Sequence, residues 1–550
     1  MEKPTQSTEP SVITGQFADV VQGRIYPAEI WMKEGKVVAI QELATAPHQL
    51  IMPGLVDAHI HIESSMMTPA SFARIAVQHG TVATVSDPHE IANVCGIEGV
   101  NYMIDSGKKV PFYFNFGAPS CVPATAFESA GAVIDSFQVD QLLAREEILY
   151  LSEMMNYPAV VCNDAEVMAK IGSAIKHNKP IDGHAPGLRG ENLEKYVASG
   201  ISTDHECVSL DEALEKISLG MKILIREGSA AKNYDALAEL LNMYPEQVMF
   251  CSDDKHPNEL VNAHIDELVR RSISHRFNVM NVLRAATLNP VNHYKLKNGL
   301  MQVGDFANYI IAEHIEEFRI NKTFINGQCV YENNQSLIEV IDEQPINKFN
   351  CKPITVEDIQ VQAQGRRIKV IEVLDGQLIT RELIADATIQ NGYVVSDIEK
   401  DILKLVVVNR YNPAKPAVAF VRNMDLKKGA IASSIAHDSH NIIAVGVDDG
   451  YIVEAINNLI QVQGGISTNS STERKVMPLA VAGLMQSGDG HKIAREYEEM
   501  HDAALSNGSK LTAPFMTLSF LALLVIPQLK LSDKGLFDGN KFDFTDLFVD

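Results

Sequence analysis

Between residue 52 and about residue 290, short apolar runs alternate with longer segments in which apolar residues recur at helical spacing. After the first apolar run, the strand-like runs are 81–88, 110–117, 148–154, 180–185, 201–206, 222–228 and 247–254. The helix-like segments between them are 68–79, 138–147, 164–177, 190–199, 209–219 and 232–243. Alternation of strand and helix favours a parallel α/β sheet, and eight such units close into a barrel. We therefore predict a (β/α)8 barrel of the TIM type over residues 52–299.

The segments on both sides of this region consist of short β pieces instead. Residues 12–51 hold apolar runs separated by glycine and proline, and similar runs return after residue 300. We expect residues 1–51 and 300–340 to pair into one small β domain built from both flanks of the barrel.

A third region follows a linker-like segment at residues 341–355. Its predicted elements are two strands and two helices, at 368–376, 403–411, 450–463 and 476–487. We expect a C-terminal α+β domain over residues 356–550.

The overall charge bears on the expected partners. The chain of 550 residues carries 47 basic and 70 acidic side chains, which gives a net charge of −23. Such a charge repels nucleic-acid phosphates, and no dense Lys/Arg run offsets it, so we expect no nucleic-acid partner. The longest apolar stretch, 515–529, is interrupted by Thr517, Ser519 and Pro527 and is too short for a membrane span. We therefore expect no membrane segment.

Cysteine usage and the N-terminal segment bear on the compartment. The seven cysteines are scattered and form no C-x-x-C pair, which favours reduced thiols over a disulfide framework. The N-terminal segment MEKPTQSTEP is polar and lacks the apolar stretch of a signal peptide. Both features predict a cytoplasmic protein.

Two histidines, His59 and His61, follow directly on the apolar run LVDA. Residues i and i+2 of a strand point to the same side, so both imidazoles face one site. At the carboxyl end of a barrel strand, that site lies where such folds keep their active sites. Imidazole is a common transition-metal ligand. Taken alone, such a pair is more often two solvent-facing histidines at a strand edge than a metal site.

Three further strand-like runs end in a side chain that can bind a metal, namely His184, His205 and Asp253. A single His or Asp at a strand end is usually a cap or turn residue. Five such residues in chain order, at the ends of successive α/β units, are instead typical of a metal centre.

Several long phrases of the sequence resemble the adenine deaminase family of the amidohydrolase superfamily, whose members are metal-dependent (β/α)8 hydrolases. These phrases are MPGLVDAHIHIESSMM, SDPHEIANV, SEMMNYPAVV, DGHAPG, TDHE and CSDDKHP. The resemblance runs from about residue 10 to the C-terminus, and the third region is similar to the family's C-terminal domain. One small departure is Thr203, where the family's phrase has serine.

The resemblance implies a binuclear metal centre. Its ligands would be His59, His61, Glu153, His184, His205 and Asp253. Many superfamily members bridge the two metals with a carboxylated lysine on the fourth strand, but the fourth strand here offers Glu153 and no lysine. The resemblance makes Glu153 the bridge, and the alternative is an ordinary surface carboxylate. Such ligands accept Mn, Fe and Zn, and we expect two divalent ions per subunit, Mn or Fe before Zn.

The activity that the resemblance implies is the hydrolysis of adenine to hypoxanthine and ammonia. Two bound cations lower the pKa of water, which can then attack C6 of the purine. Ammonia leaves only after protonation, so Asp253 is the expected proton carrier, with a purely metal-binding role as the alternative. Glu206 is expected to join it in catalysis, and His89 and Glu90 to contact the purine. His89 could instead bind metal or be structural.

The same residues bear on three alternative functions. A zinc nucleobase deaminase would need the motif H-x-E followed by P-C-x-x-C. His61 and Glu63 match the first motif, but the second motif is absent from the sequence, which excludes this class of deaminase. Another cyclic amidine or amide hydrolase of the superfamily stays open. A non-catalytic barrel scaffold would usually have lost ligands that are complete here.

Two further features have no part in the predicted catalysis. His437 and His440 flank an Asp-Ser pair, for which we favour a structural or interface role over metal binding. The β-rich parts beside the barrel favour a homo-oligomer, with a dimer as the first expectation.

Overall fold

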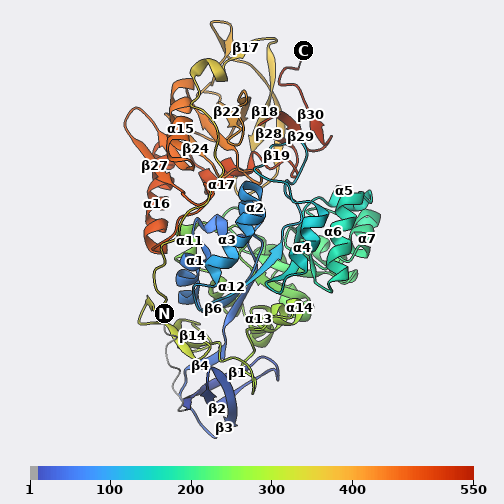
Figure 1. Cartoon of the computed structure of the whole chain (residues 1–550), viewed down its shortest axis with the longest axis vertical. Coiled ribbons are helices and arrows are strands. Elements are labelled where there is room, and N and C mark those ends of the chain that lie inside the picture. Colours follow the sequence, from blue (N-terminus) through green and yellow to red (C-terminus); the bar gives the residue numbers. More distant parts are fainter. Residues whose placement is uncertain (1–9, 550) are drawn as a thin grey trace.

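The computed structural model describes residues 10–549 and places three parts one after another along the long axis of the molecule (Figure 1). A small sheet lies at one end, the parallel strands with their helices lie in the middle, and the C-terminal region lies at the other end. Residues 1–9 lie outside the described residues, and with them almost all of the N-terminal segment on which the compartment prediction rests.

Eight parallel strands follow one another in chain order in the middle part. Five of them form one sheet: β5 (Leu55–Ile60), β6 (Thr81–Ser86), β7 (Tyr113–Ala118), β8 (Ile148–Met154) and β9 (Ile181–Gly183). Three form a second sheet: β10 (Thr203–Asp204), β11 (Lys222–Arg226) and β12 (Val248–Cys251). The Ser202 N–H donates to Ile181 O at 3.0 Å and joins the sheets at one edge, and the Asp253 N–H donates to His59 O at 2.9 Å and joins them at the other. A parallel sheet that curls back on itself fits the predicted barrel.

Amphipathic helices lie between these strands and after the last of them, as the helical spacing of apolar residues predicts. Their bounds are α1 (Pro69–Ala76), α3 (Ile97–Gly107), α4 (Ser136–Leu143), α6 (Ala165–Lys176), α7 (Gly190–Ala198), α8 (Leu210–Ser218) and α12 (Ile265–Ser274). Helix α6 begins where the Asp164 side chain accepts the backbone N–H groups of Glu166 and Val167. The predicted helix over 232–243 is divided into two short helices, α9 (Tyr234–Leu237) and α10 (Leu240–Met243).

One eight-stranded sheet combines strands from both flanks of the middle part, in the order β16-β15-β14-β13-β4-β1-β2-β3. Its strands are β1 (Ser11–Asp19), β2 (Arg24–Lys33), β3 (Lys36–Glu42), β4 (Leu50–Pro53), β13 (Tyr309–Ala312), β14 (Ile320–Ile325), β15 (Gln328–Glu332) and β16 (Gln335–Ser336). The two flanks meet where β4 and β13 pair antiparallel, with Ile51 opposite Ile311. The chain therefore enters and leaves the parallel strands through the same sheet.

The C-terminal region is built on a second eight-stranded sheet, in the order β19-β18-β23-β22-β25-β24-β26-β27. Its strands are β18 (Arg367–Val373), β19 (Thr380–Asp386), β22 (Ile402–Val408), β23 (Ala417–Arg422), β24 (Ala430–Ser433), β25 (Ile442–Gly446), β26 (Gly465–Asn469) and β27 (Arg474–Pro478). Helix α15 (Asp449–Val462) packs apolar side chains such as Ile456 against Ala432 and Ala444 of this sheet. The two strands and the first helix predicted for this region are therefore present.

The predicted helix over residues 476–487 is wrong. The first residues of this segment belong to β27, which pairs antiparallel with β26. Gly483 then has a φ of +68°, outside the helical region, so the backbone cannot continue as a helix there. The long helix of this part is α16 (Gly490–Ser506), in which many charged residues obscure the apolar spacing.

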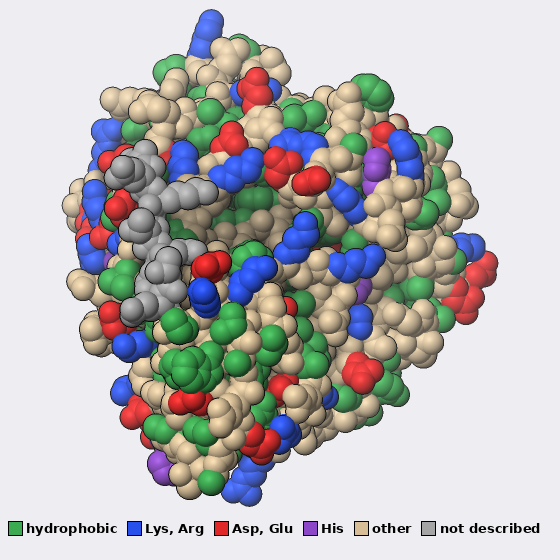
Figure 2. Space-filling model, turned by 60° about the horizontal axis from the view of Figure 1, so that its bottom comes forward, with side chains coloured by type: hydrophobic (Ala, Val, Ile, Leu, Met, Phe, Trp, Pro, Cys, Tyr) green, Lys and Arg blue, Asp and Glu red, His purple; other side chains and the backbone are tan. Residues whose placement is uncertain are grey.

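The face of the molecule shown in Figure 2 carries side chains of both charges. On the face shown in Figure 2, acidic and basic side chains are interspersed, and several Lys and Arg side chains border a central hollow. The acidic net charge therefore does not form a single acidic patch on this face.

Among the helices of residues 10–549, none is long and apolar enough to cross a membrane.

Candidate functional site

The six side chains predicted to bind metal lie together at the carboxyl ends of the parallel strands. All of them are buried, none being more than 6 % exposed. They are His59, His61, Glu153, His184, His205 and Asp253. Parallel strands end at the same edge of their sheet, so residues from distant parts of the sequence meet there.

Glu153, on β8, is at the centre of the cluster. Its Oε1 lies 3.2 Å from Nε2 of His61. Its Oε2 lies 2.7 Å from Nδ1 of His184 and 3.3 Å from Nε2 of His205. The two oxygens of one carboxylate therefore face different imidazoles. A carboxylate shared between two metal ions needs this arrangement.

His59, His61 and Asp253 form one side of the cluster. Oδ1 of Asp253 lies 3.5 Å from Nε2 of His59 and 3.2 Å from Nε2 of His61. The two Nε2 atoms are 3.3 Å apart, and the three donor atoms lie within 4.8 Å of one another. Two facing imidazole nitrogens cannot both carry a proton comfortably, whereas one divalent cation accepts a lone pair from each.

His59 and His184 each have one ring nitrogen that faces a carboxylate of the cluster, Nε2 in His59 and Nδ1 in His184. Nδ1 of His59 and Nε2 of His184 are buried and make no hydrogen bond. These nitrogens are not the ones that face the carboxylates, so each ring presents one donor atom to the cluster. The donor set of imidazoles and carboxylates therefore fits divalent metal ions.

The two carboxyl groups of the cluster are held in their ionised form. Burial by itself raises the pKa of Glu153, but the His184 charge and hydrogen bonds from the histidines outweigh burial and hold that pKa well below its usual range. Burial also raises the pKa of Asp253, and the Arg226 guanidinium outweighs it and holds that pKa well below its usual range. Both side chains are carboxylates at neutral pH, the form that binds metal.

Arg226, at the end of β11, is a site residue that the sequence patterns did not reveal. Its Nη1 donates to Oδ2 of Asp253 at 2.6 Å and to Oε1 of Glu206, and its Nη2 donates to Oε2 of Glu206 at 3.1 Å. The guanidinium therefore fixes both predicted catalytic carboxylates. Its position in the sequence could have marked Arg226 as a site residue, because it lies near the end of a strand-like run, as His184, His205 and Asp253 do.

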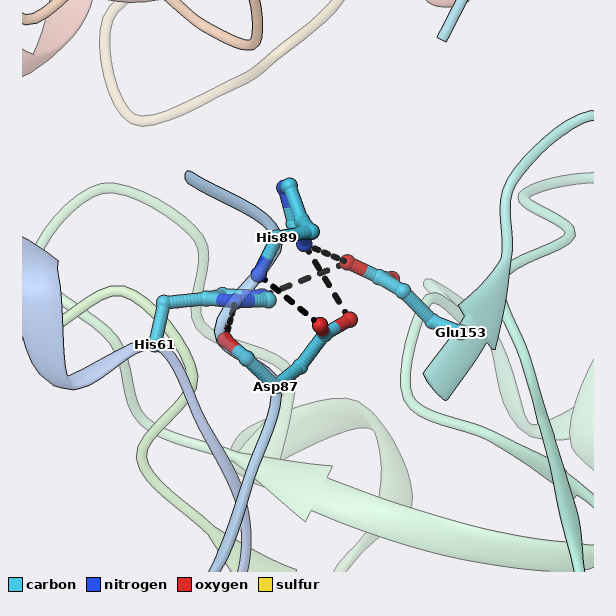
Figure 3. Close-up of side chains that lie close together, drawn as sticks. All are labelled: His61, Asp87, His89 and Glu153. Atoms are coloured by element: carbon cyan, nitrogen blue, oxygen red, sulfur yellow. Dashed lines mark hydrogen bonds and ion pairs between the residues drawn. The ribbon is translucent and has the colours of Figure 1, made fainter. Parts of the chain in front are cut away.

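The loop after β6 brings a further histidine to the cluster, as Figure 3 shows. His89, the first residue of α2 (His89–Cys95), has its Nδ1 3.1 Å from Oδ2 of Asp87 and 3.7 Å from Oε1 of Glu153. Asp87 also holds His61, whose Nδ1 is 3.2 Å from the Asp87 backbone oxygen. That contact leaves Nε2 of His61 free to face the cluster.

Glu90, which follows His89 in the sequence, contacts Ser64 and lies near His437 and His440. It is buried, and the Ser64 hydroxyl donates to its Oε1 at 3.0 Å. Its carboxylate, His437 and His440 offer ligand atoms within 4.8 Å of one another. Nδ1 of His440 accepts a hydrogen bond from the backbone N–H of Ala436 at 3.4 Å, and Nε2 of His440 is buried without a hydrogen-bond partner.

A small cavity lies over the cluster, and the C-terminal region forms part of its wall. From the middle part it is lined by His61, Glu153, His184, His205 and Asp253 of the cluster, together with His89, Met155, Glu206, Arg226 and Asp254. From the C-terminal region it is lined by Leu378, His437, Asp438, Phe520 and Leu523. The His437 and Phe520 rings stack with centroids 4.6 Å apart. Glu90 is not among the described residues that line the cavity.

Comparison with known families matches the two larger parts separately. Residues 50–330 match the family model described as the Amidohydrolase family. Residues 377–543 match the model described as the Adenine deaminase C-terminal domain. Both matches agree with the resemblance read from the sequence.

Curated relatives match the chain over nearly its whole length. A protein of Methanosarcina barkeri named adenine deaminase is 51% identical over 544 residues, which covers 97% of this chain and 99% of the relative. Relatives of the same name from Methanosarcina mazei and Salinibacter ruber are 50% and 49% identical, each covering 98% of this chain and 99% of the relative. The chain belongs to the adenine deaminase family of the amidohydrolase superfamily.

Proposed function

We propose that this chain hydrolyses adenine to hypoxanthine and ammonia. The observation that carries the proposal is the position of Glu153 between the imidazoles of His61 and of His184 and His205. The relatives named adenine deaminase, about half identical over almost the whole chain, support adenine as the substrate.

Two divalent metal ions would serve as cofactors, with Mn or Fe expected before Zn. His59, His61 and Asp253 would hold one ion and His184 and His205 the other, with Glu153 shared. Bound divalent metals would supply water that is ionised near neutral pH. The chain's own residues would then have to position the base, move a proton and exclude solvent.

Asp253 is the proposed proton carrier. Its carboxylate can accept a proton and pass it to the amine nitrogen on C6, which leaves as ammonia. Arg226 holds Oδ2 of Asp253 and so aims Oδ1 toward His59 and His61, where the reaction would occur.

Glu206 and His89 are proposed to hold the base. Burial raises the pKa of Glu206, but the Arg226 charge outweighs burial and lowers that pKa below its usual value. Glu206 is therefore a carboxylate. It would accept an N–H of the exocyclic amine. Nε2 of His89 is buried without a hydrogen-bond partner, so this imidazole can donate to a ring nitrogen of the purine.

We also propose a division into a small β domain (1–51 with 300–340), a barrel (52–299) and a C-terminal domain (356–550). The mixed eight-stranded sheet and the two family matches support this division. A cytoplasmic homodimer remains our proposal for the assembled protein, and light scattering on the purified protein tests its mass.

An ammonia-release screen tests the proposed function. The protein, loaded with Mn²⁺ or Fe²⁺, is offered adenine, adenosine, guanine and cytosine, with ammonia as the readout. We expect adenine to be turned over fastest. Ammonia from another of these compounds and none from adenine would contradict the proposal and would favour a different amidine hydrolase.

A further inference from the structure

Asp438 belongs to the C-terminal region, yet it lines the cavity over the cluster. Its Oδ1 lies 3.7 Å from Nε2 of His89, and Nδ1 of the same His89 ring lies 3.7 Å from Oε1 of Glu153. One imidazole therefore separates Asp438 from the centre of the metal cluster. A flat base whose reacting carbon lies at the cluster would reach toward Asp438 with its far edge.

One oxygen of Asp438 has no partner. Oδ1 is near His89 and 3.7 Å from Nδ1 of His437, but Oδ2 is buried and makes no hydrogen bond. The side chain is only 4% exposed, so water does not readily satisfy this oxygen. Leaving a buried acceptor unpaired is costly, and for a charged group the cost is larger. The cavity therefore presents an acceptor that an N–H group of a ligand would complete.

The loop that carries Asp438 is fixed from both sides. The Ser439 hydroxyl donates to Oε2 of Glu128 at 2.5 Å, and the Tyr411 hydroxyl donates to the Ser439 backbone oxygen at 2.5 Å. The neighbouring His437 ring is stacked on Phe520. A carboxylate on such a loop is held in place before a ligand arrives, which favours selective recognition.

The same region supplies surface for the faces of a flat ring. Leu378, Phe520 and Leu523 line the cavity beside Asp438. Apolar side chains around one oriented polar group are typical of sites that bind small heterocycles. A purine held there would have its ring faces covered and one edge opposite Asp438.

We propose that Asp438 accepts a hydrogen bond from the imidazole-ring N–H of the purine base and thereby selects the free base over its N9-substituted nucleoside. This inference rests on the proposed function, because it assumes that C6 of a purine lies at the metal cluster. In a nucleoside the N9 hydrogen is replaced by a carbon, so Oδ2 of Asp438 would stay unpaired against an apolar group. Sites that hydrogen-bond a substrate strongly reject the analogue that lacks the donor.

The test compares adenine with 9-methyladenine, which lacks the N9 hydrogen but carries no bulky sugar. In the metal-loaded wild-type protein we expect kcat/KM for adenine to exceed that for 9-methyladenine. In Asp438→Ala the ratio of the two should fall about 30-fold or more, mainly through slower turnover of adenine. In Asp438→Asn, which keeps an uncharged oxygen acceptor in nearly the same shape, the ratio should fall by about tenfold.

A matched control is Asp533→Asn. Asp533 is also a buried carboxylate of the C-terminal region, and it accepts from Ser129 N and from Asn409, at 2.8 Å each, away from the cavity. This variant should leave the ratio unchanged. An equal loss for both purines in the Asp438 variants would show a merely structural role and would overturn the inference. If Asp438→Ala does not fold, the kcat/KM ratio of Asp438→Asn alone tests the inference.

Binding of the product gives a second readout that does not depend on turnover. Calorimetry should show that hypoxanthine binds the wild-type protein more tightly than 9-methylhypoxanthine, and that Asp438→Asn reduces this difference. Failure of the wild-type protein to deaminate adenine would count against the proposed function. Normal adenine turnover with an unchanged preference in both variants would count against Asp438 alone.

Discussion

Nη1 of Arg226 donates to Oδ2 of Asp253 at 2.6 Å, so the proposed proton carrier is paired with a buried arginine. The same guanidinium binds Glu206 through both of its terminal nitrogens. Arg226 therefore sets both the position and the charge of the two carboxylates at this edge of the site. Each carboxylate also lies close to a predicted metal-binding histidine, Asp253 to His59 and Glu206 to His205.

Arg226→Gln should change how activity depends on pH. The Arg226 charge lowers the pKa of Asp253 and of Glu206, so its removal should raise both. The acid side of the kcat/KM profile should then move to higher pH, and turnover near neutral pH should fall by about 10²-fold. A full pH–rate profile measures both effects. An unchanged acid limb would show that these carboxylates do not govern the pH dependence.

Asp253→Asn should separate metal binding from proton transfer. The amide keeps an oxygen ligand but cannot carry a proton, so we expect most of the metal to be retained and turnover to fall by about 10²-fold or more. Metal analysis and ammonia release on the same sample measure the two properties. Turnover within a few-fold of the wild-type value would mean that another group carries the proton.

Glu153→Gln should reduce the metal content of the purified protein. Glu153 lies between the two groups of histidines, and the neutral amide removes the negative charge that both ions would share. Glu128→Gln is the matched control, because Glu128 is a buried carboxyl bound to Ser439 outside the cluster. Equal metal content in the two variants would argue against a bridging role.

Deletion of residues 356–550 should give insoluble or inactive protein. Leu378, Phe520 and Leu523 from this region line the cavity, so their loss would open it to water. The deletion also exposes apolar surface of the middle part that these residues cover. A soluble fragment 1–340 with normal activity toward adenine would show that the C-terminal region is an accessory.

The sequence predicts those parts of the site that depend on local pattern. His184, His205 and Asp253 end apolar runs, so their place at strand ends follows from spacing alone. Arg226 also ends such a run, but a terminal arginine on a strand is normally solvated, and only the structure pairs it with Asp253. The closeness of His89 to Asp438 joins distant parts of the chain through packing that no local periodicity encodes. The helix predicted over 476–487 failed for a related reason, because pairing with β26 outweighs the local apolar spacing.

The central claim is that the buried cluster around Glu153 is a two-metal centre for the deamination of adenine. The most direct measurement is a titration of metal-free protein with Mn²⁺, in which ammonia release from adenine and bound metal are followed together. We expect almost no activity without metal and a rise that saturates at about two equivalents per chain. Full activity of the metal-free protein, or no activity on adenine with the metal bound, would contradict this claim.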